Sequence, residues 1–105
     1  MATATISIGR GGGERRLSDA EWTNFTSHII AMLNHIGATV FVNAAESIGE
    51  WEGVEEESRT WVADIHDRRD FVTGWLELSA AAFEQDAIAF TVGETTLVTP
   101  PIREA

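Results

Sequence analysis

Residues 17–37, LSDAEWTNFTSHIIAMLNHIG, carry the clearest secondary-structure signal of the chain. Ser18 and Glu21 have the spacing of a capping box, in which the two side chains satisfy free N–H groups at the start of a helix. Leu17 and Trp22 have the spacing of a hydrophobic staple around the same start. The stretch therefore predicts a helix that begins at Ser18 and ends at Gly37, a residue typical of helix ends.

Apolar residues at steps of three and four form one stripe along this helix, which predicts that it packs on a core. The stripe consists of Trp22, Phe25, Ile29, Leu33 and Ile36. A second stripe consists of Phe71, Trp75, Leu78 and Ala82. It predicts another helix, which we expect to start at Asp67 because Asp67 and Asp70 imitate a capping box, and to end near Gln85 or Asp86.

Four other segments favour β-strands by alternation or by their β-branched and aromatic residues. They are residues 2–8, 38–44, 58–65 and 87–92. The resulting order β-α-β-β-α-β predicts an α+β fold of the ferredoxin-like type, with a four-stranded antiparallel sheet and two helices on one face. We expect one domain over residues 1–99 and a C-terminal tail over residues 100–105, which begins with Pro100 and Pro101.

The composition excludes several classes of protein. The chain has no cysteine, so disulfides, thiolate metal sites and cysteine nucleophiles are excluded. Its 17 acidic and 7 basic residues give a net charge of -10, which disfavours direct binding to nucleic acid or membranes and favours a basic protein partner. Without a long apolar run or a signal-like N-terminus, a cytoplasmic protein is expected.

Residues 49–58, GEWEGVEEES, are strongly acidic and are expected to connect the second and third strands as a hairpin. One interpretation is a solvated turn; others are a docking loop anchored by Trp51, an acidic decoy or a cation site. The spacing lacks the pattern of a calcium loop, so no metal is predicted. The candidate partner-binding residues are Glu50, Trp51, Glu52, Glu55, Glu56 and Glu57.

Two further sites are considered. A pocket between sheet and helices would be lined by His28, Trp61, His66 and Gln85. The bare face of the sheet would carry Phe41 and Val62 near its centre and could pair with a second copy in a homodimer. The loop at residues 9–16, GRGGGERR, lacks the glycine spacing of nucleotide-binding motifs, and Arg10, Arg15 and Arg16 give only a weak candidate anion site.

The chain also resembles a family of small ferredoxin-like domains of unknown function from bacteria and actinobacterial phages. The resemblance is carried by residues 18–22 (SDAEW) with Phe25, by Gly49-x-Trp51, by Glu57-Ser58 and by Phe83-x-Gln85. It implies a ferredoxin-like fold and a phage or prophage source, and hence the host cytoplasm. It implies no established activity.

The leading hypothesis is a non-catalytic phage accessory protein that acts by protein-protein interaction, because the chain is acidic and contains no recognised catalytic motif. One alternative is a small-molecule binder or cofactor-independent enzyme of the dimeric ferredoxin-like barrel type. Another is an acidic mimic of nucleic acid. No cofactor is predicted.

Overall fold

The computed structural model describes residues 1–51, 53–96, 98 and 100–101, and for Trp51 it describes the backbone alone. The predicted partner binding by Glu52 and by the Trp51 side chain therefore concerns atoms outside the described residues. The secondary-structure elements are β1 (Ala2–Gly9), the 3-10 turn η1 (Gly13–Arg15), α1 (Asp19–His35), β2 (Thr39–Trp51), β3 (Val54–Asp64), α2 (Arg69–Ala82) and β4 (Ala89–Glu94).

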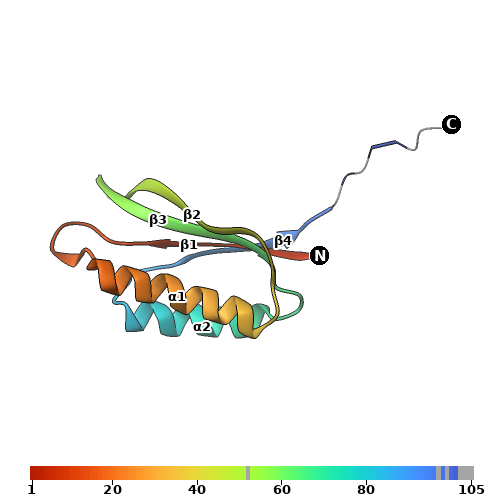
Figure 1. The fold of residues 1–105 in the computed structure, drawn as a ribbon, viewed down its shortest axis with the longest axis horizontal. Coiled ribbons are helices and arrows are strands. Elements are labelled where there is room, and N and C mark those ends of the chain that lie inside the picture. The colour runs from red at the N-terminus through yellow and green to blue at the C-terminus, as the bar shows by residue number, and fades with distance from the viewer. Residues whose placement is uncertain (52, 97, 99, 102–105) are drawn as a thin grey trace.

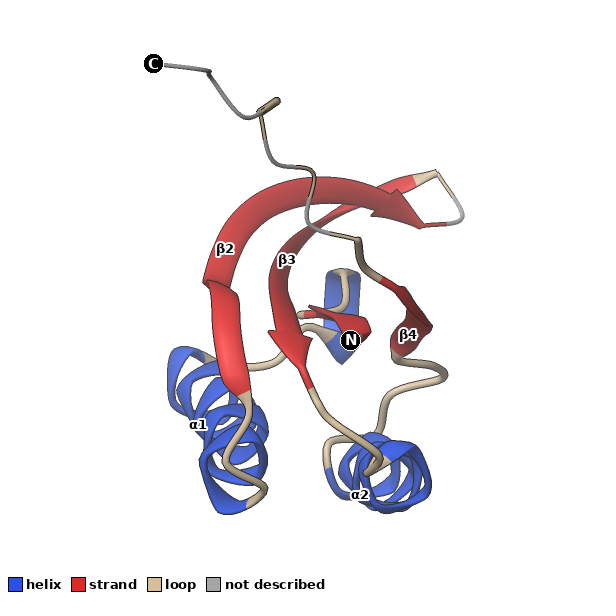
Figure 2. Cartoon of the chain, turned by 90° about the vertical axis from the view of Figure 1, so that its right-hand side faces the viewer, coloured by secondary structure: helices blue, strands red, loops and turns tan. Residues whose placement is uncertain are grey.

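The strands form a 4-stranded sheet in the order β2-β3-β1-β4, in which all paired strands are antiparallel. Both helices cover the same face of this sheet, and β2 arches over the opposite face (Figures 1 and 2). The predicted ferredoxin-like α+β architecture is confirmed. No helix among the described residues is long and apolar enough to cross a membrane.

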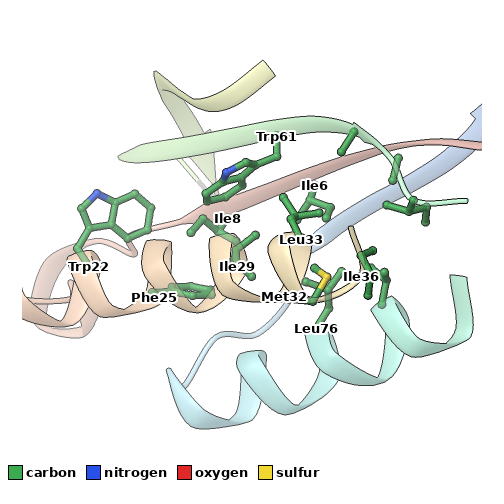
Figure 3. Packing of buried hydrophobic residues seen from close by; sticks show 14 of the residues in the cluster. Ile6, Ile8, Trp22, Phe25, Ile29, Met32, Leu33, Ile36, Trp61 and Leu76 are labelled. Carbon is green, nitrogen blue, oxygen red and sulfur yellow. The ribbon is translucent and has the colours of Figure 1, made fainter. Parts of the chain in front are cut away.

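The core lies between the sheet and the helices (Figure 3). Alternate residues of β1 and β3 point into it, and they meet the apolar stripe of α1. The fully buried members include Ile6, Phe25, Ile29, Met32 and Trp61. The Trp61 indole N–H donates to Asn43 Oδ1 at 3.1 Å, so the largest fully buried side chain has its polar atom satisfied.

The predicted start of α1 is confirmed. Glu21 N donates to Ser18 Oγ at 3.2 Å, and Ser18 N donates to Glu21 Oε1 at 3.0 Å. Leu17 and Trp22 are both buried, as a hydrophobic staple requires.

The predicted start of α2 at Asp67 is wrong. The N-cap is Arg68, which makes no side-chain capping hydrogen bond, and the helix begins at Arg69. Asp64 organises the preceding turn instead: its Oδ1 accepts from His66 N at 2.9 Å, and His66 has a positive φ of 57°. The helix then ends at Ala82, before the expected Gln85.

The acidic residues do not form a long connection between strands. β2 continues to Trp51 and β3 starts at Val54, so most of the acidic stretch belongs to the paired ends of a long hairpin. Backbone pairing extends this far although Glu50 lies directly opposite Glu55, where like charges repel. Further down the hairpin, Arg59 donates to its cross-strand neighbour Glu46 at 3.0 Å, a pairing that favours this register.

Candidate functional site

A cavity of about 420 Å³ lies at the end of the sheet where the β2–β3 hairpin turns. This end also holds the loop after β1 and the connection from α2 to β4 (left in Figure 1). The lining comes from the end of β1, from the loop of residues 10–17 (the glycine loop), from β3 and from residues 84–89. Its volume falls within the range of about 300–1,000 Å³ that is typical of small-molecule sites.

The cavity starts on the face of the sheet that the helices leave bare. Successive side chains of a strand point to opposite faces, and Trp61 and Ala63 point into the core. Val54, Glu56 and Ser58 therefore lie on the helix-free face, where they line the cavity. This location differs from the expected pocket between sheet and helices, where the core is filled by buried apolar side chains.

Glu56 is held at one wall of the cavity by the glycine loop. Gly11 N donates to Glu56 Oε2 at 2.9 Å. The other carboxylate oxygen, Oε1, accepts no hydrogen bond from the described residues and lies close to the Cα of Gly9, where a built Cβ would be 2.5 Å away. Gly9 thus provides the space in which this carboxylate sits, and the Gly11 N–H fixes its orientation.

Another part of the lining is formed where α2 ends. Glu84 has a positive φ of 53°, and Gln85 N donates to Ala80 O at 2.8 Å, which closes the helix. The residues that follow the helix, Glu84, Gln85 and Asp86, all line the cavity. The C-terminal end of a helix carries a partial negative charge, so it adds to the field of these carboxylates.

The charge of the lining is predominantly negative. Glu56, Glu84 and Asp86 contribute carboxylates, whereas Arg15 is the one basic residue of the described lining. Arg15 Nη1 lies 3.5 Å from Asp86 Oδ2, and both side chains are mostly exposed. Such an exposed ion pair is worth no more than about 1 kcal/mol, so a ligand can displace it. The arrangement favours a cationic ligand.

The remaining acidic candidates have other surroundings. Glu57 forms ion pairs with Arg10 at 3.2 Å and with Arg16 at 2.6 Å. Glu50 and Glu55 are exposed near the tip of the hairpin. The acidic residues of this stretch therefore differ in their surroundings, and among those that the structure describes Glu56 is the one that lines the cavity beside the glycine loop.

The structure does not bring the four candidate pocket residues together. Gln85 lines the cavity, and its Nε2 donates to Phe83 O at 2.9 Å. Trp61 is fully buried in the core. His28 stacks on Trp75 between the helices, with 4.8 Å between ring centroids. His66 lies beyond β3, where its Nε2 is 3.3 Å from Gly37 O.

The three arginines of the glycine loop do not form an anion site. Arg10 and Arg16 pair with Glu57, and Arg15 pairs with Asp86. These partners are distant in the sequence, which is why the spacing GRGGGERR did not reveal them. No group of three or more histidine, aspartate or glutamate residues able to hold a metal occurs in the described part of the chain.

The proposed dimer face remains a prediction. Val62 is half-buried on the helix-free face and lies opposite Val42. Phe41, which is 52% exposed, occupies the irregularity of β2 between Val40 and Val42. A measurement of the solution mass tests whether a second copy covers these residues.

Sequence reasoning missed most of the cavity. Ser7, Glu84 and Asp86 line it, and none of them stands in a recognisable motif. The one local signal was Gly9, whose missing side chain permits a close approach of the Glu56 carboxylate to the backbone.

The solved structures that share the fold include two of phage SAM lyases. A phage SAM lyase in its apo state superposes with a TM-score of 0.57 and 20% sequence identity, over 88% of this chain and 78% of that chain. A phage SAM lyase in complex with S-methyl-5′-thioadenosine superposes with a TM-score of 0.54 and 18% identity, over 89% of this chain and 80% of that chain. No protein-family model and no curated protein sequence matches the chain.

These neighbours overturn the leading functional hypothesis. That hypothesis was a non-catalytic interaction protein, whereas both neighbours are lyases and one is in complex with S-methyl-5′-thioadenosine. They are also phage proteins, in keeping with the phage part of the resemblance. The family of unknown function receives no support from the comparisons.

Proposed function

We propose that the chain is an enzyme that cleaves S-adenosylmethionine (SAM) and releases S-methyl-5′-thioadenosine, with the cavity at the glycine loop as part of its active site. The observation that carries the proposal is the negative lining of this cavity, in which the Glu56 carboxylate is fixed by Gly11 N at 2.9 Å. The fold shared with phage SAM lyases supports the choice of substrate.

The charge of the substrate matches the charge of the site. SAM carries a sulfonium cation and an amino-acid arm with one ammonium and one carboxylate, so its net charge is positive. The carboxylates of Glu56, Glu84 and Asp86 and the C-terminal end of α2 attract such a ligand. The net charge of the whole chain, -10, acts in the same direction over longer distances.

The reaction has a simple electron balance. The bond between the sulfonium sulfur and Cγ of the amino-acid arm breaks, and its electron pair stays on sulfur as the neutral thioether of S-methyl-5′-thioadenosine. The four-carbon arm fills the vacant valence at Cγ in one of two ways. Its own carboxylate attacks Cγ and closes a lactone, or Cβ loses a proton to a base and a double bond forms between Cβ and Cγ. Neither route needs a redox partner or a water molecule as reactant.

The movement of charge in this reaction determines whether Glu56 can assist binding or catalysis. The positive charge on sulfur disappears as the bond breaks, so a carboxylate beside it stabilises the bound substrate more than the transition state. Glu56 therefore serves to select and orient the cation, which places its effect mainly in KM. If the arm instead leaves by proton loss, Glu56 Oε1 is the free carboxylate oxygen that can accept the proton, and its effect falls on kcat.

The test is to incubate the purified protein with SAM and to measure S-methyl-5′-thioadenosine by liquid chromatography and mass spectrometry. We expect the product to form in proportion to protein concentration and faster than in a protein-free control, which corrects for spontaneous breakdown. The second control is the Glu56→Gln protein. Product formation at the spontaneous rate, together with no calorimetric binding of S-methyl-5′-thioadenosine, would refute the proposal.

A further inference from the structure

Arg10 is a buried arginine at the base of the glycine loop, with a relative exposure of 8%. Its Nε donates to Leu17 O at 2.8 Å, its Nη1 donates to Glu57 Oε2 at 3.2 Å, and its Nη2 pairs with Asp19. The hydrogen bond to Asp19, followed by that to Glu57, raises the pKa of the Arg10 guanidinium above its ordinary value. The group therefore stays charged, and each of its three nitrogens is engaged.

The backbone of Arg10 closes the same loop. Leu17 N donates to Arg10 O at 2.9 Å, and Arg10 N donates to Glu57 O at 2.9 Å. Together with the bond from Arg10 Nε to Leu17 O, residues 10 and 17 are joined in both directions. The two ends of the glycine loop are thereby fixed to each other and to β3.

The segment between these ends forms a wall of the cavity. Gly11 and Gly12 line the cavity, and Gly11 has a positive φ of 80°. The loop packs closely on β3, because a Cβ built at Gly12 would lie 2.6 Å from Val54 Cγ1. The position of the Gly11 N–H, and hence of the Glu56 carboxylate, depends on how the loop is held at its base.

Consecutive glutamates of β3 hold the loop from two sides. Glu56 lies on the helix-free face and accepts from Gly11 N, whereas Glu57 follows it on the opposite face and accepts from Arg10. Within the described lining of the cavity, neither Arg10 nor Glu57 is present. Arg10 therefore acts on the cavity through the residues that it holds, which are the ends of the glycine loop and Glu57 of β3.

We infer that Arg10 is a positioning residue of the proposed active site: it fixes the base of the glycine loop so that Gly11 N holds Glu56 toward the substrate. The inference rests on the proposed function for its effect on SAM. The part of the inference that concerns structure, namely that Arg10 keeps the Gly11 amide in place, can be measured without any substrate.

The test is Arg10→Lys, which keeps the positive charge but loses the planar fork that reaches Leu17, Glu57 and Asp19 at once. We expect faster hydrogen exchange of the Gly11 amide by NMR and a rise in KM for SAM of about 10- to 100-fold, as expected for a misplaced binding group. The matched control is Arg59→Lys, since Arg59 is also partly buried and ion-paired, with Glu46 at 3.0 Å, but lies outside the described lining.

The outcomes separate this inference from the proposed function. If the wild-type protein does not cleave SAM, the proposed function fails, and the Gly11 exchange rate alone decides the role of Arg10. If Arg10→Lys leaves both the Gly11 exchange rate and KM as they are in Arg59→Lys, Arg10 has no positioning role. Should Arg10→Lys fail to fold, Glu57→Gln, which removes one partner of Arg10, is measured in its place with the same criteria.

Discussion

The carboxylate of Glu56 lies directly against the Cα of Gly9. A Cβ built at residue 9 would be 2.5 Å from Glu56 Oε1 and 2.8 Å from Glu56 Cδ, distances that real Cβ atoms do not show. Gly9 has an ordinary φ, so the absence of a side chain here serves the neighbouring carboxylate and not the local backbone conformation. Because of this contact, a single methyl group added at residue 9 tests whether Glu56 acts from its observed position.

Gly9→Ala is expected to displace the Glu56 carboxylate while leaving the fold intact. The clashing atoms are the end of a flexible side chain, so we expect the melting temperature to change by only a few degrees. The KM for SAM is expected to rise by about 10- to 100-fold, because a small misplacement of a binding group has effects of that size. Steady-state kinetics and thermal unfolding are the measurements.

The matched control is Gly93→Ala in β4, where a built Cβ has no heavy atom within 4 Å. Its kinetics are expected to equal those of the wild type. A Gly9→Ala protein that is folded and kinetically normal would show that Glu56 does not act from its observed position.

Glu56→Gln tests the charge and keeps the shape of the side chain. The amide oxygen can still accept from Gly11 N, so the loop is expected to keep its conformation. Loss of a charged partner worth about 1.5–3 kcal/mol predicts a rise in KM of about 10- to 100-fold with no fall in kcat. The control is Glu55→Gln, whose side chain is exposed and adjacent on the same strand. A collapse of kcat at unchanged KM would assign Glu56 the role of a base.

Much of the fold could be predicted from local patterns. The start of α1 at Ser18 is a matter of neighbouring residues, because both hydrogen bonds of the capping box join residues three apart. The strand order follows from the sequence of elements. The start of α2 was mispredicted because Asp64, outside the expected capping box, organises the turn through its contact with His66 N.

The site was harder to predict because its residues are brought together by tertiary structure. Gly11 and Glu56 are 45 positions apart, and Arg15 and Asp86 are 71 positions apart. The sequence shows where the acidic residues are concentrated. It does not show that Glu56 binds the Gly11 N–H whereas Glu57 binds Arg10, because these partners depend on which face of the strand each residue occupies. No spacing rule within the stretch distinguishes the two.

The capping box predicts a specific pH dependence of stability. The Ser18 N–H, followed by the Ser18 hydroxyl, lowers the pKa of Glu21 below its ordinary value. A carboxylate whose folded-state pKa is lowered stabilises the fold above its unfolded-state pKa, about 4.3, and this contribution is lost as the pH falls through the folded value.

Thermal unfolding of wild type and Glu21→Gln, from neutral pH to about pH 3, measures this effect against the ordinary Glu pKa of about 4.3. We expect the wild type to be more stable at neutral pH and the difference to shrink in acid. A difference that stays constant over this range would show that the charge of Glu21 does not contribute.

Gly74 lies inside α2, and a Cβ built there has no heavy atom within 4 Å. Gly74→Ala is therefore expected to raise the free energy of unfolding by about 0.5–1 kcal/mol, because glycine is the costlier residue in a helix interior. Gly37 has equally open surroundings but a φ of +66°, so Gly37→Ala is expected to lower the same quantity by about 1–2 kcal/mol. The free energy of unfolding of both variants is measured with urea. Because both sites have space for a Cβ, a difference between the two proteins reports the backbone conformation of Gly37. An equal change in the free energy of unfolding of the two proteins would contradict the positive φ of Gly37.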